Sequence, residues 1–297
     1  MSVPVADRHE AFRAALGPRG AGDGEPFRAH ADPIDADVNW SDELEELHEE
    51  ASRDHFIDVW TRRALMDEIA PAIAPGAVIA DLGCSSGYLL EELRERWPDA
   101  LLVGVDLVAS GLRNASRNVP EAELVLSDVT RLPFGDATVD AVVSANLLEH
   151  VPDDAAALAE VARVLRPGGR AAIIVPAGPG LYDYYDRFLE HERRYGRHEL
   201  GYLAARAGLR VVRDAYVGSL IYPPFWAVKK RNRRRFGALS DAEVIERVKA
   251  DIDRTTNSRL GYVACALERR MVRAGAGLPF GIRSLVCAER LVEGAPR

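Results

Sequence analysis

The stretch ADLGCSSGYLL, residues 80–90, decides how the chain folds. Residues 78–80 are typical of the end of a buried strand, and the leucines that recur from residue 89 onward predict a helix with one apolar face. Gly83 and Gly87 lie between these two elements. Glycines let a ligand approach the main chain, and the free N–H groups of a helix start favour negative charge. The stretch therefore indicates a nucleotide cradle, although a tight glycine turn also serves packing alone.

Length, composition and charge limit what the chain can be. Its 297 residues, 47% apolar and 28% charged, suit one large α/β domain or two small ones. The net charge of −8 argues against wholesale nucleic-acid binding but leaves room for a local patch. Cys84, Cys265 and Cys287 lie far apart and have no metal-ligand spacing, so the sequence predicts a reducing compartment and no metal. It shows neither an export signal nor a run of about 18 apolar residues, which predicts a cytoplasmic protein.

The chain divides into five segments by composition and periodicity. Residues 1–39 are rich in Gly, Pro, Ala and charge, and we expect much of this tail to be mobile. N-terminal helices are predicted over 40–76 and an α/β core over 77–217. A helical lid or insertion is expected over 218–280, and the last strand of the core with a C-terminal tail over 281–297.

Strands and helices alternate through the predicted core. Strands are predicted over 77–82, 101–106, 123–127, 139–145 and 170–175, with helices or short loops between them. This order predicts a mostly parallel, doubly wound sheet with right-handed crossovers. Ligands of such sheets bind at the carboxyl ends of the strands. The polar residues at these ends are Asp81, Asp106, Asp128 and Asn146.

Three of these side chains bear on the choice of ligand. An acid at the end of the second strand, Asp106, could accept hydrogen bonds from both hydroxyls of a ribose, as in NAD-binding folds. Asp81 could hold a ligand ammonium, directly through the backbone or through water, and Asp128 could accept from an adenine amino group. A dinucleotide fold needs neither of the last two, so the set favours a different nucleoside ligand.

Five motifs carry a family resemblance. DLGCSSG, GVDLV, SDVTRLPF, VSANLLEHVPD and VLRPGGRAAIIVPA follow one another across residues 78–176. In order and spacing they resemble the motifs of class I S-adenosylmethionine-dependent methyltransferases. The resemblance implies S-adenosyl-L-methionine as cofactor and a Rossmann-like sheet of seven strands. It also implies that the last strand, IRSLVCAER, runs antiparallel between the fifth and the sixth.

The same resemblance implies roles for single residues. It implies Asp81, Gly83 and Gly87 around the methionine part, Asp106 and Leu107 at the ribose, Asp128 and Val129 near the adenine, and Asn146 beside the sulfonium. One departure is visible, because Ser85 stands where the commonest form of the first motif has a glycine, and we expect a slightly less open turn.

An aromatic helix ahead of the core gives a weaker resemblance. EEASRDHFIDVWTRR is similar to the N-terminal helix of methyltransferases in which aromatic residues cover the cofactor. Phe56 and Trp60 could do so here. Packing of the helix on the sheet is the favoured interpretation.

Two histidines are candidates for catalysis. Methyl transfer is an in-line displacement, and a hydroxyl or ammonium acceptor also needs a base. For His150, in LLEHVPD, a structural or cofactor-side role is the favoured interpretation. His191, in LEHERRYG, is the better candidate base. The alternative is that His191 and Arg194 only pin their loop to the core.

Aromatic and basic residues gather around His191 in the sequence and suit a planar or anionic small molecule. The candidate acceptor-binding residues are Tyr182, Tyr185, Arg193, Arg194 and Tyr195. Residues 229–235, KKRNRRR, could contact an anionic membrane or a phosphate-bearing substrate, but a solvated face is favoured.

These residues predict a methyltransferase with a small-molecule acceptor of natural-product-like or sugar-like chemistry, as in secondary metabolism. O-methylation is favoured over N- or C-methylation. The alternatives are methylation of a lipid-linked sugar or a macromolecule, a non-catalytic protein that binds S-adenosylmethionine, and an NAD-dependent oxidoreductase. The sequence predicts neither the acceptor nor the oligomeric state.

Overall fold

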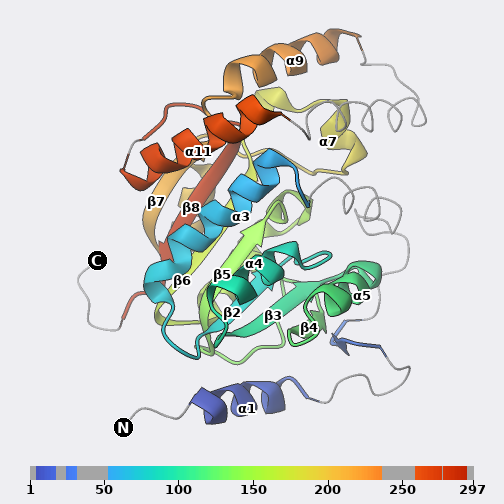
Figure 1. Ribbon diagram of the computed structural model, residues 1–297, viewed down its shortest axis with the longest axis vertical. Coiled ribbons are helices and arrows are strands. Elements are labelled where there is room, and N and C mark those ends of the chain that lie inside the picture. The colour runs from blue at the N-terminus through green and yellow to red at the C-terminus, as the bar shows by residue number, and fades with distance from the viewer. Residues whose placement is uncertain (1–4, 18–24, 32–52, 236–257, 276, 293–297) are drawn as a thin grey trace.

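A mostly parallel sheet of eight strands forms the centre of the protein (Figure 1). The computed structural model describes residues 5–17, 25–31, 53–235, 258–275 and 277–292. The strands are β1 (Arg28–Ala29), β2 (Val78–Leu82), β3 (Leu101–Asp106), β4 (Glu123–Leu126), β5 (Val139–Ala145), β6 (Leu165–Pro176), β7 (Arg210–Val217) and β8 (Arg283–Glu289). Their order is β1-β4-β3-β2-β5-β6-β8-β7, and β8 is antiparallel to both of its neighbours. This arrangement confirms the predicted doubly wound fold, including the antiparallel last strand.

Helices cover both faces of the sheet. They are α1 (Val5–Ala15), α3 (Phe56–Ile69), α4 (Tyr88–Arg96), α5 (Ala109–Asn118), α6 (Asp154–Val164), α7 (Tyr184–Phe188), α8 (Glu199–Arg206), α9 (Tyr222–Arg235) and α11 (Arg259–Arg273). In Figure 1, α3, α4, α5 and α11 lie in front of the sheet. Buried residues of α1, α6 and α8 belong to the core cluster on the opposite face.

Both faces of the central strands are buried, and for this reason the sequences of these strands are almost continuously apolar. In β2, Val78 and Ala80 belong to the core cluster shared with α6, whereas Ile79 belongs to the cluster shared with α3 and α4. This alternation follows from the two-residue period of a strand. The three-layer packing leaves the carboxyl ends of the parallel strands as the place where polar side chains can gather.

The N-terminal tail differs from its prediction. The described parts of residues 1–39 are packed. Phe12 of α1 and Leu16, just after the helix, are buried in the core cluster, and β1 pairs with the outer edge of β4. Strand β1 raises the strand count from the expected seven to eight. Composition predicted mobility because these apolar residues are few and widely spaced, yet each finds a complementary site on the folded core.

Two described helices lie in the predicted lid, residues 218–280. These are α9 and α11, while residues 236–257 of the predicted lid lie outside the described residues. Helix α11 packs on α3, where Gly261 contacts the Phe56 ring so closely that a Cβ at Gly261 would lie 2.8 Å from it. Phe56 and Trp60 are both buried in the core cluster of this face, as the packing interpretation expects.

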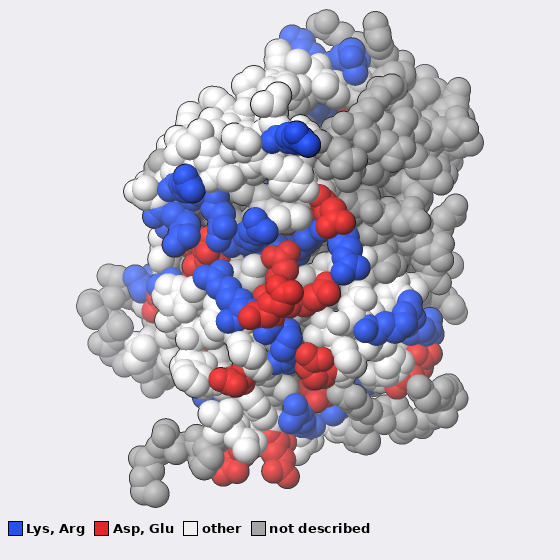
Figure 2. All heavy atoms as spheres, in the orientation of Figure 1, with Lys and Arg blue, Asp and Glu red and all other residues white. Residues whose placement is uncertain are grey.

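The face in front of the sheet carries charges of both signs. Figure 2 shows Lys and Arg interspersed with Asp and Glu across this face. Several of these side chains pair, as in Arg62 with Glu92 at 2.6 Å and Arg269 with Asp67 at 2.7 Å. The face therefore lacks the one-signed field that attracts polyanions. Among the described helices, none is both long and apolar enough to span a membrane.

Candidate active site

The turn between β2 and α4 adopts left-handed backbone at three positions. The φ angles are +76° at Gly83, +46° at Ser85 and +81° at Gly87. A Cβ at Gly83 would lie 3.1 Å from the side chain of Leu147, so both conformation and space favour glycine there. Ser85 keeps the left-handed conformation without being a glycine, and its N–H donates to Oδ2 of Asp106 at 2.8 Å. Ser85 thus takes the backbone conformation that a glycine adopts most easily, and the expected slightly less open turn stays a prediction.

Backbone donors orient Asp106 at the end of β3. Its Oδ1 accepts from the N–H of Val108 at 2.9 Å, and its Oδ2 accepts from Ser85. The two bonds fix the carboxylate at the strand end, and its ribose role stays a prediction. Leu107 follows it and is half-buried.

Asp81 and Asn146 carry buried oxygens that lack a hydrogen-bond donor among the described residues. These oxygens are Oδ2 of Asp81 and Oδ1 of Asn146, whose φ is +52°. Burial, reinforced by the charge of Asp106 and opposed by Arg62, raises the pKa of Asp81 to about 8. An unpaired buried polar group is costly until a partner arrives. The two side chains fit the cationic methionine part of S-adenosylmethionine, which would supply that partner.

The third strand end is shaped by its own backbone. Asp128 is half-buried, and its Oδ1 accepts from the N–H of Thr130 at 2.8 Å. Val129 is buried in the core cluster shared with α6. The structure thus brings the candidate cofactor residues to the carboxyl ends of neighbouring strands, β2, β3, β4 and β5. Asp128 and Val129 keep their adenine role as a prediction.

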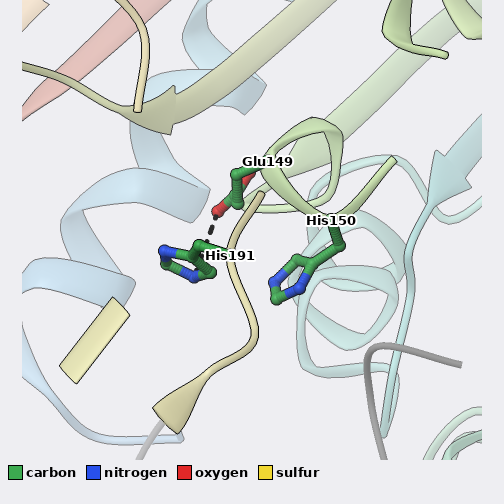
Figure 3. Close-up of side chains that lie close together, drawn as sticks. All are labelled: Glu149, His150 and His191. Carbon is green, nitrogen blue, oxygen red and sulfur yellow. Dashed lines mark ion pairs between the residues drawn. The ribbon is translucent and has the colours of Figure 1, made fainter. Parts of the chain in front are cut away.

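A cluster of two histidines and a glutamate, Glu149, His150 and His191, lies just beyond the end of β5 (Figure 3). One ligand-type atom from each residue lies within 4.8 Å of those of the other two. The rings of His150 and His191 meet edge to face, with centroids 4.8 Å apart. The backbone N–H of Glu192 donates to the carbonyl of Glu149 at 2.8 Å and joins the two segments. The structure therefore brings the two candidate catalytic histidines together.

Asp186 fixes the orientation of His191. Its Oδ1 lies 3.0 Å from Nδ1 of His191 and accepts from Nε of Arg194 at 2.6 Å. Burial favours the neutral acid, but His191, Arg194 and Lys229 together hold the pKa of Asp186 well below its usual range. An ionised Asp186 can only accept, so Nδ1 of His191 carries the hydrogen. The other ring nitrogen, Nε2, lies 4.0 Å from Oε1 of Glu149.

Glu149 is the residue of this cluster that the sequence analysis missed. Its side chain is fully buried, and both carboxylate oxygens lack a hydrogen-bond donor among the described residues. Burial, against the opposing charge of His191, raises the pKa of Glu149 to about 7. Its place directly before His150 was visible in the sequence, but the approach of His191 was not. Only the fold shows that this carboxylate faces a histidine.

The predicted acceptor residues are largely engaged within the protein. The hydroxyl of Tyr182 donates to the carbonyl of His191 at 2.7 Å, and Arg193 donates to Asp154 at 3.0 Å. Tyr195 is fully buried, and its hydroxyl donates to Asp154 at 2.8 Å. Tyr195 is therefore a core residue rather than part of a wall facing an acceptor, which corrects the sequence-based assignment.

Arg194 is likewise buried and bound to Asp186 and to the carbonyl of Ala177. These contacts are what the alternative interpretation, in which Arg194 pins its loop to the core, expects. Tyr185 lies beside Lys229, whose Nζ is 5.4 Å from the ring centroid. The acceptor roles of Tyr182, Tyr185, Arg193 and Arg194 stay predictions.

The basic run does not form a uniform solvated face. Lys229, at its start, is buried and donates to Asp183 at 2.6 Å and to Asp186 at 3.3 Å. Lys230 stands over the ring of Trp226 at 4.6 Å, and Arg231 is exposed. The favoured prediction was therefore wrong for Lys229, because two buried carboxylates attract its ammonium inward.

Comparison with known proteins finds a family for the α/β core. Residues 80–173 match a family model described as a methyltransferase domain. This part of the chain is therefore a methyltransferase domain, in agreement with the resemblance to class I S-adenosylmethionine-dependent methyltransferases. S-adenosyl-L-methionine is the cofactor of such domains, and the buried unpaired oxygens of Asp81 and Asn146 lie at the strand ends of this one.

Curated relatives and a solved structure are similar to the chain in part. It is 38% identical over 158 residues to a trans-aconitate 2-methyltransferase from Azoarcus sp., covering 53% of this chain and 58% of the relative. It is 35% identical over 136 residues to a demethylmenaquinone methyltransferase from Corynebacterium kroppenstedtii, covering 43% and 56%. The chain thus spans little more than half the length of these two relatives.

The geranyl diphosphate C-methyltransferase of Streptomyces coelicolor superposes with a TM-score of 0.54 at 16% identity, over 97% of this chain and all of that one. Identity at this level supports the shared fold. The chemistry of the acceptor has to be argued from the site itself.

Proposed function

We propose that the protein transfers the methyl group of S-adenosylmethionine to the oxygen of a small-molecule acceptor. The curated relatives named above carry small-molecule names, trans-aconitate and demethylmenaquinone, which supports an acceptor of this size. The natural-product-like or sugar-like character of the acceptor and a cytoplasmic location stay predictions from the sequence.

One observation supports an acceptor atom that loses a proton, as a hydroxyl or an ammonium does, over an activated carbon; the preference for oxygen over nitrogen stays a prediction from the sequence. The Asp186 carboxylate lies 3.0 Å from Nδ1 of His191 and leaves Nε2 as the proton-accepting nitrogen. Glu149, three residues after Asn146, lies beside this nitrogen. Glu149 and His191 are both buried. A hydroxyl must lose its proton as it attacks the methyl group, and a histidine fixed in one tautomer can accept it. A carbon nucleophile with an activated π bond would not need such a base at the moment of attack.

The alternatives have less support. Methylation of a lipid-linked sugar or a macromolecule was suggested by the basic run, but Lys229 points inward to Asp183 and Asp186. The mixed charges of the face in Figure 2 do not favour nucleic acid. A non-catalytic protein that binds the cofactor would need the strand-end residues. Cofactor binding alone does not explain why Glu149 and His191 are buried side by side.

The test is a transfer assay with methyl-labelled S-adenosylmethionine and a panel of hydroxylated, amino and carbon-nucleophile small molecules. We expect labelled product from hydroxyl acceptors and much less of it with Asp106→Ala, because the loss of charge-assisted bonds to the ribose costs about 1.5–3 kcal/mol per bond. In calorimetry, we expect Asp106→Ala to bind S-adenosylhomocysteine more weakly by roughly one to two decades of affinity for each bond lost.

A matched control is Asp99→Asn, an exposed acid outside the site. Product methylated only at nitrogen or carbon would overturn the preference for oxygen. Tight S-adenosylhomocysteine binding without transfer to any member of a broad panel would favour the non-catalytic alternative.

A further inference from the structure

We propose that Glu149, His150 and His191 bind a divalent first-row transition-metal ion. The sequence predicted no metal, because its cysteines lack ligand spacing and its histidines are far apart along the chain. The fold brings one glutamate and two histidines to within 4.8 Å of one another, measured between their ligand atoms. Figure 3 shows the Glu149 carboxylate directed at the His191 ring, with the His150 ring on the neighbouring side.

The spacing suits a metal after a small contraction. Bonds of about 2.0–2.2 Å to nitrogen and oxygen place neighbouring ligand atoms roughly 3–3.4 Å apart. The 4.0 Å between Nε2 of His191 and Oε1 of Glu149 is therefore close to a coordinated distance. Even the largest separation, 4.8 Å, needs each of two side chains to move by less than about 1 Å.

A buried carboxylate that lacks a donor is the second, independent observation. Glu149 has no exposed surface, and neither of its oxygens accepts a hydrogen bond from a described residue. Taking a charged or polar group out of water without a partner costs several kcal/mol, and buried charges in proteins are paired or coordinate metals. A dication in the cluster would satisfy both oxygens.

Asp186 prepares His191 for coordination. Metal-bound histidines almost always donate their second ring nitrogen to a carboxylate or carbonyl, which fixes the tautomer and raises ligand basicity. Nδ1 of His191 lies 3.0 Å from Oδ1 of Asp186, which leaves the Nε2 lone pair on the side of Glu149. Asp186 is thus a positioning residue that acts through His191.

The donor set favours a particular class of ion. Two imidazoles and one carboxylate suit Zn²⁺, Fe²⁺, Co²⁺ or Mn²⁺ better than Mg²⁺ or Ca²⁺, which prefer oxygen ligands throughout. Three protein ligands leave at least one coordination position for a substrate or water. His150 is only half-buried, so the cluster is not sealed from solvent on its side.

A bound ion would act on the acceptor, and this role rests on the proposed function. The ion would hold the acceptor oxygen and lower the pKa of its hydroxyl, so that the proton passes to water before the oxygen attacks the methyl group. In that state the Nε2 lone pair of His191 holds the metal, and the histidine no longer needs to accept the proton itself.

The experiment measures metal binding alone, on the full chain stripped of metal and without cofactor or acceptor. Zn²⁺ is titrated against a chromophoric chelator, and Co²⁺ is followed by its visible absorption. We expect one site per chain, weakened about 100-fold or more in Glu149→Gln and His191→Gln and about 10–100-fold in Asp186→Asn. His150→Gln tests the third ligand.

His198→Gln is the matched control, because His198 also pairs with an aspartate, Asp214 at 2.9 Å, but its side chain is 60% exposed. S-adenosylhomocysteine binding by each variant reports that the fold is intact. Affinity that is equal in wild type, Glu149→Gln and His191→Gln would overturn the proposal, as would the absence of a site in the wild type. Because no methyl transfer is measured, failure of the proposed function leaves this result unaffected.

Discussion

At the end of β2, the buried carboxyl of Asp81 gives the free energy of unfolding a distinct pH dependence. Its pKa is about 8 in the folded protein and about 3.9 in an unfolded chain. Between these values the folded state keeps a proton that the unfolded state has released, so the free energy of unfolding falls as pH rises from about 4 to about 8. We expect Asp81→Asn to flatten this decline and to stabilise the cofactor-free protein near pH 8 by on the order of a few kcal/mol.

Denaturant unfolding between pH 5 and pH 8 measures the effect. The same variant should bind S-adenosylhomocysteine about tenfold more weakly or worse, because an amide cannot pair with the ligand ammonium. The exposed Asp99→Asn serves as control and should change neither quantity. A wild-type stability that rises over this pH range would show that Asp81 is ionised in the folded protein.

Single residues were predicted from the sequence when their role depends on the strand that carries them. Asp81, Asp106, Asp128 and Asn146 follow from where a strand stops, and the sheet brings these ends together. Glu149 and Lys229 did not follow, because each depends on a partner that the chain contributes from a distant segment. No local pattern marks such a pair before the fold is known.

At the scale of elements, Lys229 joins α9 to the loop around α7. Its ammonium lies between the buried carboxylates of Asp183 and Asp186. Removing one partner of a buried ion pair is expected to cost about 3–5 kcal/mol, because the remaining charge is left uncompensated. We therefore expect Lys229→Met to lower the free energy of unfolding by this amount and to speed amide exchange in α9.

Hydrogen exchange of the α9 peptides, compared with Lys230→Met, checks this expectation. Lys230 contacts the Trp226 ring, so its loss should cost less than about 1 kcal/mol. Adding Asp183→Asn to Lys229→Met removes the orphaned charge and should restore part of the stability. Equal effects of Lys229→Met and Lys230→Met would contradict the role of the buried pair.

Elements were predicted best where apolar periodicity and a cap agree. Helix α6 begins after Asp153, whose side chain caps it by accepting from the N–H of Ala156 at 2.9 Å. Strand β6 begins at Leu165, earlier than the predicted 170, because Leu165 already pairs with Val139 of β5; the pairing with β5 resumes at Arg170 after an irregularity that contains PGG. Helix α1 escaped prediction, since its buried residues are too few to give a periodic signal.

For the whole molecule, the N-terminal segment closes one side of the sheet. Strand β1 pairs with β4, and Glu123 of β4 binds both Arg13 and Arg28. An open sheet edge offers unpaired N–H and C=O groups to other chains. We expect deletion of residues 1–17 to lower the unfolding temperature, and deletion of residues 1–31 to add self-association beyond that of the full chain.

Thermal unfolding and light scattering of the two deletions separate the effects. The shorter deletion removes α1 and keeps β1, so it is the matched control for exposure of the β4 edge. Unfolding temperatures equal to that of the full chain would show that α1 contributes no stability. Equal association of both deletions would show that β1 does not protect the edge.

The position of β8 also sets an order of events during folding. Among the described strands, β7 pairs with β8 alone, and β8 is inserted between β6 and β7 although it comes last in sequence. Strands β1 to β6 can therefore assemble while the chain is still being synthesised, with the cofactor side of the sheet complete. Strand β8, the partner of β7, emerges from the ribosome only after residues 218–280. The β7 side of the sheet is therefore the last part of the protein to become native.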